Sequence, residues 1–257
     1  MEQQTFPEFT PDPQREAICR ARLREYLTRC GQTAPDANVE NLFAEVCSSD
    51  RYDYFAPRMP ATTRRCLLVS GCSVGSEMIV ARRYGFQEIR GTEVNALYAE
   101  IARERLQGQP GFGVAVYDGK ALPYENDMFT AITSGHVIEH TPSPFAYFRE
   151  HMRVLAPGGI MFLEFPDRYH PVELHTNLPS LEYLPLPLRA LMLRYRASRF
   201  SRLPLDQRRY YDEVRRELRP VSGWQIRLFL RLASPRTGRL LHAYSPVPGF
   251  VRMLVRK

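Results

Sequence analysis

The sequence lacks the features that mark secreted, disulfide-stapled or membrane-spanning proteins. It has five cysteines, Cys19, Cys30, Cys47, Cys66 and Cys72, but no Cys-x-x-Cys pair, and this scatter predicts reduced thiols. No apolar run approaches the ~20 residues that a membrane span needs. The N-terminus has no basic region followed by an apolar segment, so no secretory signal is visible. These absences predict a cytoplasmic location, and we assign no residue to a metal.

Lysine is almost absent. It occurs only at Lys120 and Lys257, so arginine carries nearly all of the positive charge. The net charge of +7 is uneven: from Arg189 onward there are 17 basic and 4 acidic residues, against 18 basic and 24 acidic before it. The basic third suggests an anionic partner, such as a phosphorylated substrate, a membrane surface or nucleic acid. Solvated, arginine-rich helices with no partner are the alternative.

From residue 65 onward, short apolar runs alternate with segments of helical periodicity. The expected strands are 66–70, 88–93, 111–117, 129–134 and 160–165, and the expected helices are 75–84, 96–106 and 144–155. A last helix over 224–232 precedes a hairpin of 240–245 and 250–256. Alternation at this spacing implies a parallel sheet with helices on both faces. We therefore predict an α/β, Rossmann-like fold with a seven-stranded, mostly parallel sheet and a C-terminal antiparallel hairpin.

Two segments lie outside this alternation. Residues 1–62 contain helical patterns at 14–30 and 38–46 but no catalytic pattern, so we expect an N-terminal helical cover over the ligand side. Residues 63–257 then form the main domain, in which 167–221 are an inserted helical segment that faces an acceptor or a membrane. The aromatic residues Tyr52, Tyr54 and Phe55 either line a pocket or pack in the core.

The stretch from Cys66 to Glu93 organises the rest of the chain. An apolar run ends in a small-residue turn, a helix follows, and a second short strand ends in a carboxylate. Gly71 and Gly75 let the backbone turn sharply and approach a ligand where a Cβ would clash. Glu93 lies about twenty residues further on, where a carboxylate accepts hydrogen bonds from ribose hydroxyls. The stretch therefore predicts half of a nucleotide-binding βαβ unit, whose ligand binds at the carboxyl ends of the strands.

Motifs at the strand ends occur in register along residues 64–166. They are Gly71-Cys72-Ser73-Val74-Gly75, Gly91-Thr92-Glu93, Asp118-Gly119 with Leu122-Pro123-Tyr124, Phe129-Thr130-Ala131-Ile132, Val137-Ile138-Glu139-His140 and Arg153-Val154-Leu155-Ala156-Pro157-Gly158-Gly159. Together they resemble the class I S-adenosylmethionine-dependent methyltransferases, in particular the small-molecule (type 11) group related to quinone biosynthesis. The resemblance implies that residues 63–257 are a methyltransferase domain.

Three residues depart from the pattern of this family. Val69 stands where an acidic residue is usual, Ser73 replaces the middle glycine of the turn, and Thr130 replaces a common aspartate. The change at Val69 implies either weaker cofactor binding or a compensating carboxylate such as Glu77.

The resemblance implies that S-adenosyl-L-methionine is the cofactor. The turn residues would surround its methionine part, Glu93 would bind the ribose diol, and Asp118 would accept from the adenine amino group. The implied cofactor-binding residues are Gly71, Cys72, Ser73, Gly75, Glu93, Asp118, Gly119, Ser134, Gly135 and His136. Glu93 and Asp118 have an alternative role as capping or surface carboxylates.

Methyl transfer mainly needs alignment of the reactants, although an oxygen nucleophile benefits from a general base. His140 follows the strand expected at 129–134, and histidine is the residue type most often used as such a base. The alternative is a helix-start histidine bonded to the backbone. Residues 166–179 resemble, over a short stretch, a subgroup often found among sugar and cell-surface polysaccharide methyltransferases. Asp167, Glu173 and His175 are then candidates for positioning a hydroxyl, and a rigid proline-rich loop is the alternative.

Residues 184–203 mix apolar side chains with five arginines, which suits a bilayer surface or an amphipathic helix packed on the core. Our main hypothesis is methyl transfer to an oxygen of a small molecule or saccharide, with peripheral contact to the inner face of the membrane. The alternatives are an RNA methyltransferase, although no RNA-binding module is evident, and a catalytically inactive binding protein. We expect no nucleic-acid partner, and the sequence specifies neither the acceptor nor the oligomeric state.

Overall fold

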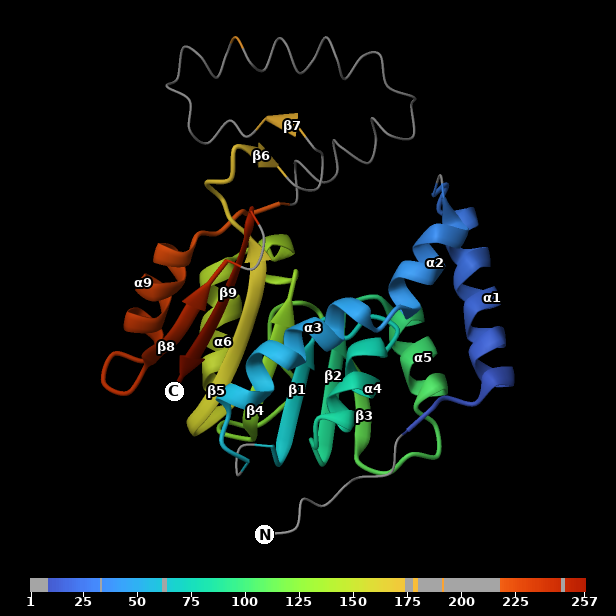
Figure 1. The fold of residues 1–257 in the computed structure, drawn as a ribbon, viewed down its shortest axis with the longest axis horizontal. Coiled ribbons are helices and arrows are strands. Elements are labelled where there is room, and N and C mark those ends of the chain that lie inside the picture. Colours follow the sequence, from blue (N-terminus) through green and yellow to red (C-terminus); the bar gives the residue numbers. More distant parts are fainter. Residues whose placement is uncertain are drawn as a thin grey trace.

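The computed structural model describes residues 9–32, 34–61, 64–173, 178–179, 191, 218–245 and 248–257, and its centre is a seven-stranded sheet (Figure 1). The order of strands across the sheet is β3-β2-β1-β4-β5-β9-β8. These strands are β1 (Cys66–Ser70), β2 (Glu88–Glu93), β3 (Phe112–Val116), β4 (Phe129–Gly135), β5 (Leu155–Pro166), β8 (Arg239–Tyr244) and β9 (Phe250–Arg256). Two short strands, β6 (Val172–Glu173) and β7 (Leu178–Pro179), pair with each other in a separate sheet.

Strands β1 to β5 run parallel to one another. Strand β9 is antiparallel to both β5 and β8, so β8 runs in the direction of the first five strands. The predicted α/β fold, with a mostly parallel sheet and a C-terminal antiparallel hairpin, is confirmed. Because parallel strands end at the same edge, the carboxyl ends of β1, β2 and β4 lie side by side.

Helices cover both faces of the sheet (Figure 1). On one face, Leu67 and Val69 of β1 pack with Met78 of α4 (Ser76–Arg83). On the other, Leu68 packs in a cluster with Phe148 of α6 (Pro144–Val154) and residues of α9 (Gly223–Ala233). Helix α5 (Ala96–Arg105) contacts β2 and β3. Burial of β1 on both faces explains why its sequence is a continuous apolar run.

Side-chain caps set where several helices begin. Asn95 accepts a hydrogen bond from the Leu97 N–H at 3.0 Å, so α5 begins at Ala96, its predicted start, with two residues between it and the end of β2. Ser143 accepts from the Ala146 N–H at the start of α6, and Ser222 forms a capping box with Gln225 at the start of α9. The cap at Asn95 keeps the link from β2 to α5 short, directly beside the strand ends.

The N-terminal part is helical: α1 (Pro13–Arg29), α2 (Pro35–Phe43), α3 (Val46–Phe55) and the 3₁₀ turn η1 (Ala56–Arg58). Helix α1 packs against α5 and α2, and α3 packs against α4. A buried ion pair, 2.8 Å from Arg105 Nε to Glu16 Oε2, joins α5 to α1. These helices form the expected cover, and the boundary at residue 62 stays a prediction.

The second helix differs from its predicted range of 38–46. It begins at Pro35, whose fixed φ suits a first helical turn, and it ends at Phe43 because Ala44 is extended, with ψ of 137°. A separate helix, α3, then contains Tyr52 and Phe55, which are fully buried in the core. These two aromatic residues therefore pack in the core and do not line a pocket.

Helix α6 ends at Val154, one residue before its predicted end, and the sequence Pro157-Gly158-Gly159 lies inside β5, which begins earlier than the predicted strand 160–165. The pairing of β4 with β5 shifts register between Phe129 and Ala131, which accommodates these residues. Within the inserted segment 167–221, the sequence also predicts helices over 188–200 and 207–218. Apart from Leu191 and Leu218, these two ranges lie outside the described residues. Within the described ranges, every helix is too short or too polar to cross a membrane.

The packing of β2 against α4 gives a test of the fold. A Cβ at Gly91 would lie 2.6 Å from both Cys72 Sγ and Met78 Sδ, and both neighbours are buried. We expect Gly91→Ala to lower the free energy of unfolding by about 1–3 kcal/mol in urea titrations. In the control Gly223→Ala, the new Cβ would meet nothing nearer than Val251 Cγ1 at 3.8 Å, so a change below about 0.5 kcal/mol is expected. Equal stabilities of the two variants would contradict this packing.

Candidate functional site

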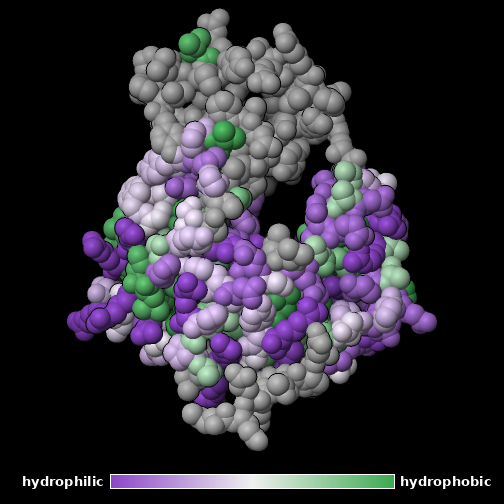
Figure 2. Space-filling model, in the orientation of Figure 1, coloured by the Kyte–Doolittle hydropathy of each residue, from purple (hydrophilic) through white to green (hydrophobic). Residues whose placement is uncertain are grey.

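A cavity of about 410 Å³ opens at the carboxyl ends of β1, β2 and β4. Figure 2 shows the surface hollowed between α2 and these strand ends, with a mostly hydrophilic rim. The cavity is lined by seven of the predicted cofactor-binding and catalytic residues, and by Glu77, the predicted compensating carboxylate. The seven are Gly71, Cys72, Ser73, Glu93, Gly135, His136 and His140. Residues of α2 and α3, including Leu42 and Arg51, also line it. The helical cover therefore forms part of the cavity wall.

The turn after β1 depends on the left-handed backbone region. Gly71, Ser73 and Gly75 have φ of 71°, 49° and 87°. At Gly71 a Cβ would lie 2.5 Å from Val137 Cγ2, so this position needs glycine for space as well as for angle. The backbone N–H groups of Gly71 and Cys72 both donate to the Thr92 carbonyl at 2.9 Å. Ser73 keeps a strained conformation because its surroundings hold the turn in place.

The carboxylate of Glu93 is the anchor of this turn. Its Oε2 accepts from the Ser73 N–H at 2.9 Å, and its Oε1 accepts from the N–H groups of Val94 and Asn95 at 2.8 and 2.9 Å. The side chain is 8% exposed and lines the cavity. A carboxylate has about four acceptor positions, so about one remains for a ligand.

Ser73 also presents an unsatisfied polar atom. It lines the cavity, and its Oγ is buried without a hydrogen-bond partner among the residues that the structure describes. Buried hydroxyl groups in native proteins are nearly always bonded, so this oxygen points to a ligand that supplies the partner. The serine that replaces the middle glycine therefore fits the site as a ligand contact.

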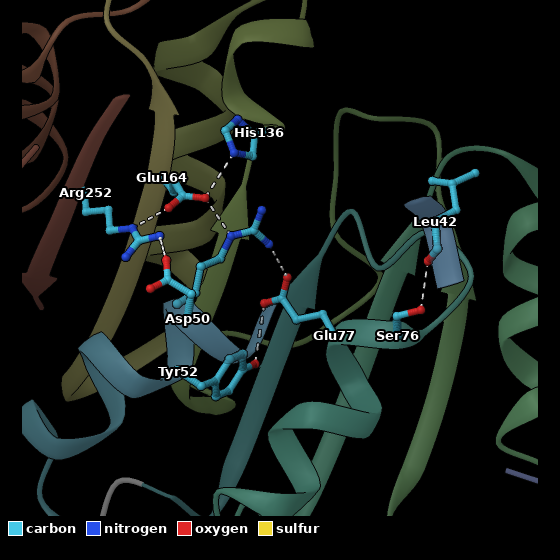
Figure 3. A network of polar contacts seen from close by, with 9 residues as sticks. Leu42, Asp50, Tyr52, Ser76, Glu77, His136, Glu164 and Arg252 are labelled. Atoms are coloured by element: carbon cyan, nitrogen blue, oxygen red, sulfur yellow. Dashed lines mark hydrogen bonds and ion pairs between the residues drawn. The ribbon is translucent and has the colours of Figure 1, made fainter. Parts of the chain in front are cut away.

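Arg51 of α3 is a site residue that the sequence analysis missed. Its Nε donates to Glu164 Oε1 at 2.6 Å, and its Nη1 donates to Glu77 Oε2 at 3.0 Å. Glu164 of β5 also accepts from Arg252 of β9, which in turn donates to Asp50 (Figure 3). This network, which is buried except at Asp50, joins α3, α4, β5 and β9. No motif surrounds Arg51, and its partner Glu164 lies 113 positions away, so only the fold identifies it.

Two carboxylates flank His136, which has a left-handed backbone with φ of 56°. Its Nε2 lies 3.0 Å from Glu164 Oε1, and its Nδ1 lies 3.7 Å from Glu139 Oε1. Burial by itself lowers the pKa of His136, but the neighbouring carboxylates of Glu139 and Glu164 outweigh it and raise the pKa above its ordinary value. For the carboxyl group of Glu164 the directions are reversed. Burial by itself raises its pKa, but contacts with His136 and Arg51 outweigh burial and lower the pKa to about 2. The pair favours an imidazolium beside a carboxylate.

Four predicted cofactor residues do not line the cavity. Gly75 packs α4 on α5, because its Cβ would lie 3.2 Å from Ala102 Cβ. The Ser134 hydroxyl hydrogen-bonds the Tyr147 hydroxyl at 2.7 Å, within the buried core. Asp118 is exposed, and it accepts from the Lys120 and Ala121 N–H groups, which lower its pKa. Gly119 lies beside Val94, a cavity residue, so the segment 118–119 is next to the rim.

The three predicted catalytic residues fall in different places. His140 ends the 3₁₀ turn η3 (Ile138–His140), is exposed and lines the cavity. Asp167 follows β5 but stays outside the cavity lining, and its Oδ1 accepts from the Tyr169 N–H at 3.1 Å. His175 lies outside the described residues.

Comparison with protein families supports the motifs found along the strands. The family model described as "Methyltransferase domain" matches residues 68–163. The methyltransferase GfsG of Streptomyces halstedii is 31% identical over 107 residues, which are 40% of this chain and 38% of the relative. A 2-methyl-6-phytyl-1,4-hydroquinone methyltransferase of Synechocystis is 31% identical over 103 residues, 40% of this chain and 31% of the relative. The chain thus matches only about a third to two fifths of the length of these relatives.

Solved structures show the same fold. An S-adenosylmethionine-dependent methyltransferase from Mesorhizobium loti matches with a TM-score of 0.57 at 12% identity, over 80% of this chain and 97% of that one. A second such enzyme, from Aquifex aeolicus, matches with a TM-score of 0.54 at 11% identity, over 90% of this chain and 97% of that one. These structures confirm the predicted fold, and the family model over residues 68–163 supports the predicted resemblance.

Removal of the Glu93 carboxylate should destabilise the turn. Glu93→Ala leaves three backbone N–H groups without their charged acceptor, so we expect the free energy of unfolding to fall by about 3 kcal/mol. The control Glu88→Ala, at the other end of β2, removes one half-exposed ion pair with Arg90 and should cost about 0.5 kcal/mol or less. Urea unfolding measures both. A similar, small loss in both variants would show that Glu93 does not anchor the turn.

The network around Glu164 predicts a specific acid sensitivity. Because its pKa falls from an ordinary 4.5 to about 2 on folding, its contribution to stability is present above pH 4.5 and is lost as the pH falls towards 2. We expect this contribution to be on the order of 3 kcal/mol in the wild type and absent in Glu164→Gln, whose unfolding free energy should depend less on pH in this window. Glu88→Gln should keep the wild-type slope. A wild-type slope in Glu164→Gln would refute the assignment.

Proposed function

We propose that this chain, which carries a class I S-adenosylmethionine-dependent methyltransferase domain, transfers a methyl group to an oxygen of a small molecule or saccharide. The observation that carries the proposal is the cavity at the carboxyl ends of β1, β2 and β4. There the left-handed turn at Gly71, the unsatisfied Ser73 hydroxyl and the Glu93 carboxylate meet. These groups suit a ligand with amino-acid and ribose parts.

The cofactor would lie along this edge of the sheet. Gly71, Cys72 and Ser73 would hold its methionine part, and the remaining acceptor position of Glu93 would bind the ribose diol. Val69 is fully buried and cannot offer a charge, whereas Glu77 lines the cavity, where it also accepts from Arg51. Glu77 is therefore the proposed compensating carboxylate for the cofactor's amino group. Asp118 and Gly119, next to the rim, are proposed for the adenine.

S-adenosylmethionine supplies a methyl group that its sulfonium already activates. The protein then has to align the acceptor oxygen and accept its proton. His140 is the proposed base, because it is exposed at the cavity wall. His136 is less suited, because its contacts with Glu139 and Glu164 favour the protonated form. Asp167 and His175 are proposed to position the acceptor.

The proposal also specifies the chemical class of the acceptor, an oxygen of a small molecule or saccharide. The relatives include enzymes named as N- and C-methyltransferases, so the choice of oxygen comes from the polar segment 166–179 and its saccharide-type pattern. Contact of residues 184–203 with the inner face of the membrane is proposed from composition alone; apart from Leu191, this segment lies outside the described residues. A lipid-linked saccharide acceptor would agree with both features.

His140→Ala should separate binding from chemistry. We expect calorimetry to give an affinity for S-adenosylmethionine near that of the wild type, while transfer of labelled methyl falls by about 10²–10⁴-fold. The control His242→Ala, on the distant edge strand β8, should leave both unchanged. Unchanged transfer in His140→Ala would remove it as the base.

The acceptor assay uses cell-extract fractions separated into lipid-linked glycans, small molecules and RNA. Label in the glycan or small-molecule fraction supports the proposal, and label in RNA alone contradicts it. Absence of S-adenosylmethionine binding by the wild type would contradict the enzyme assignment itself.

A further inference from the structure

Helix α9 has one face that packs on the core and another that is covered by nothing in the described structure. Ile226 and Leu230 are buried against the sheet. Trp224, Leu228 and Leu232 recur every fourth residue and are 54%, 43% and 60% exposed. Figure 2 shows hydrophobic side chains gathered on the left, over α9 and β8, with hydrophilic ones around them. Three large apolar side chains in one exposed stripe are more than scattered surface residues.

Arginines accompany this stripe. Arg227 and Arg231 are exposed on the same side of α9, and Arg236 and Arg239 follow it. None of the four has a hydrogen bond or ion pair with another described residue, whereas arginines of α1 such as Arg20 and Arg22 pair with glutamates. Residues 218–257 contain eight basic residues and no aspartate or glutamate. The positive charge on this face is therefore not neutralised within the described protein.

We propose that the α9 face, defined as Trp224, Arg227, Leu228, Arg231 and Leu232, docks on an anionic lipid bilayer. A bilayer surface accepts apolar side chains between its headgroups and provides negative charge beside them, which is the combination this face requires. A second copy of the chain would place arginines against arginines. Nucleic acid would match the charge and a base can stack on Trp224, but Leu228 and Leu232 offer it no stacking surface, so two of the three apolar side chains would have no role.

The face lies close to the end of the molecule where the acceptor is proposed to bind. Trp224, at the start of α9, donates from Nε1 to the hydroxyl of Tyr169 at 3.3 Å, and Tyr169 follows strand β5. Docking through α9 would therefore bring the segment after β5 to the membrane surface. The proposal stands apart from the proposed methyl transfer, because it rests on α9 alone.

The test uses the fluorescence of Trp224, which is the single tryptophan of the chain. The full-length protein is titrated with phosphatidylcholine vesicles with and without phosphatidylglycerol, and separately with RNA. We expect a blue shift and protection from acrylamide quenching on the anionic vesicles, with a much weaker response on the neutral ones. No response on anionic vesicles would overturn the proposal. An equal response to RNA would also overturn it. So would a blue shift that appears without vesicles when the protein concentration is raised, because it would indicate contact between copies of the chain.

Two double variants test whether the α9 face is the part of the protein that binds the vesicles. Arg227→Gln with Arg231→Gln should weaken vesicle binding about thirtyfold, at about fivefold for each arginine near the surface, and Leu228→Ser with Leu232→Ser should also weaken it. The controls are Arg29→Gln with Arg65→Gln, and Ile18→Ser, which is 55% exposed on α1. These controls should bind like the wild type, and circular dichroism confirms that every variant folds. Equal losses in the control arginine pair would indicate general charge attraction and refute the site.

Discussion

The three hydrogen bonds that the Glu93 carboxylate accepts are the constraint on which the rest of the site depends. They fix the Ser73 N–H after β1 and the N–H groups at the end of β2 to the same two oxygens. These bonds hold Ser73 in the left-handed backbone region, which residues other than glycine rarely adopt. The same carboxylate is the one proposed to bind the ribose, so ligand binding and the shape of the turn share a single group.

The second constraint is the group of ion pairs around the buried carboxylate of Glu164. Burial of several charges is costly unless each is paired, and here Arg51, Arg252 and His136 all contact Glu164. Because Arg51 belongs to α3 and Arg252 to β9, this carboxylate connects the N-terminal cover and the last strand at the cavity edge. The helical cover is therefore part of the site through specific polar contacts, in addition to apolar packing.

The sequence predicted the scaffold better than the side-chain directions. Bounds such as Cys66–Ser70 and Glu88–Glu93 agree with the structure, because apolar runs and the polar groups that end them are local signals. Ser134 and Gly135 were both predicted to bind the cofactor, but neighbouring residues of a strand point to opposite faces of the sheet. The Ser134 hydroxyl hydrogen-bonds Tyr147 in the core, whereas Gly135 lines the cavity. Arg51 could not be predicted, because its role exists only once α3 lies against β5. For Glu93, capping and ligand binding were predicted as alternatives, whereas the structure shows a carboxylate that both caps the turn and lines the cavity.

The position of β9 has a consequence for how the chain folds. This strand lies between β5 and β8, although it follows both in sequence. While the chain is being synthesised, the parallel strands β1 to β5 therefore precede the strand that covers their edge, and β5 offers open hydrogen-bonding groups until residues 250–256 arrive. The same arrival brings Arg252 to Glu164, so closure of the sheet coincides with the last of the ion pairs that surround the buried carboxylate. A ribosome-bound chain without β9 would have the turn and the strand ends, but also an exposed strand edge and one fewer cation at the cavity.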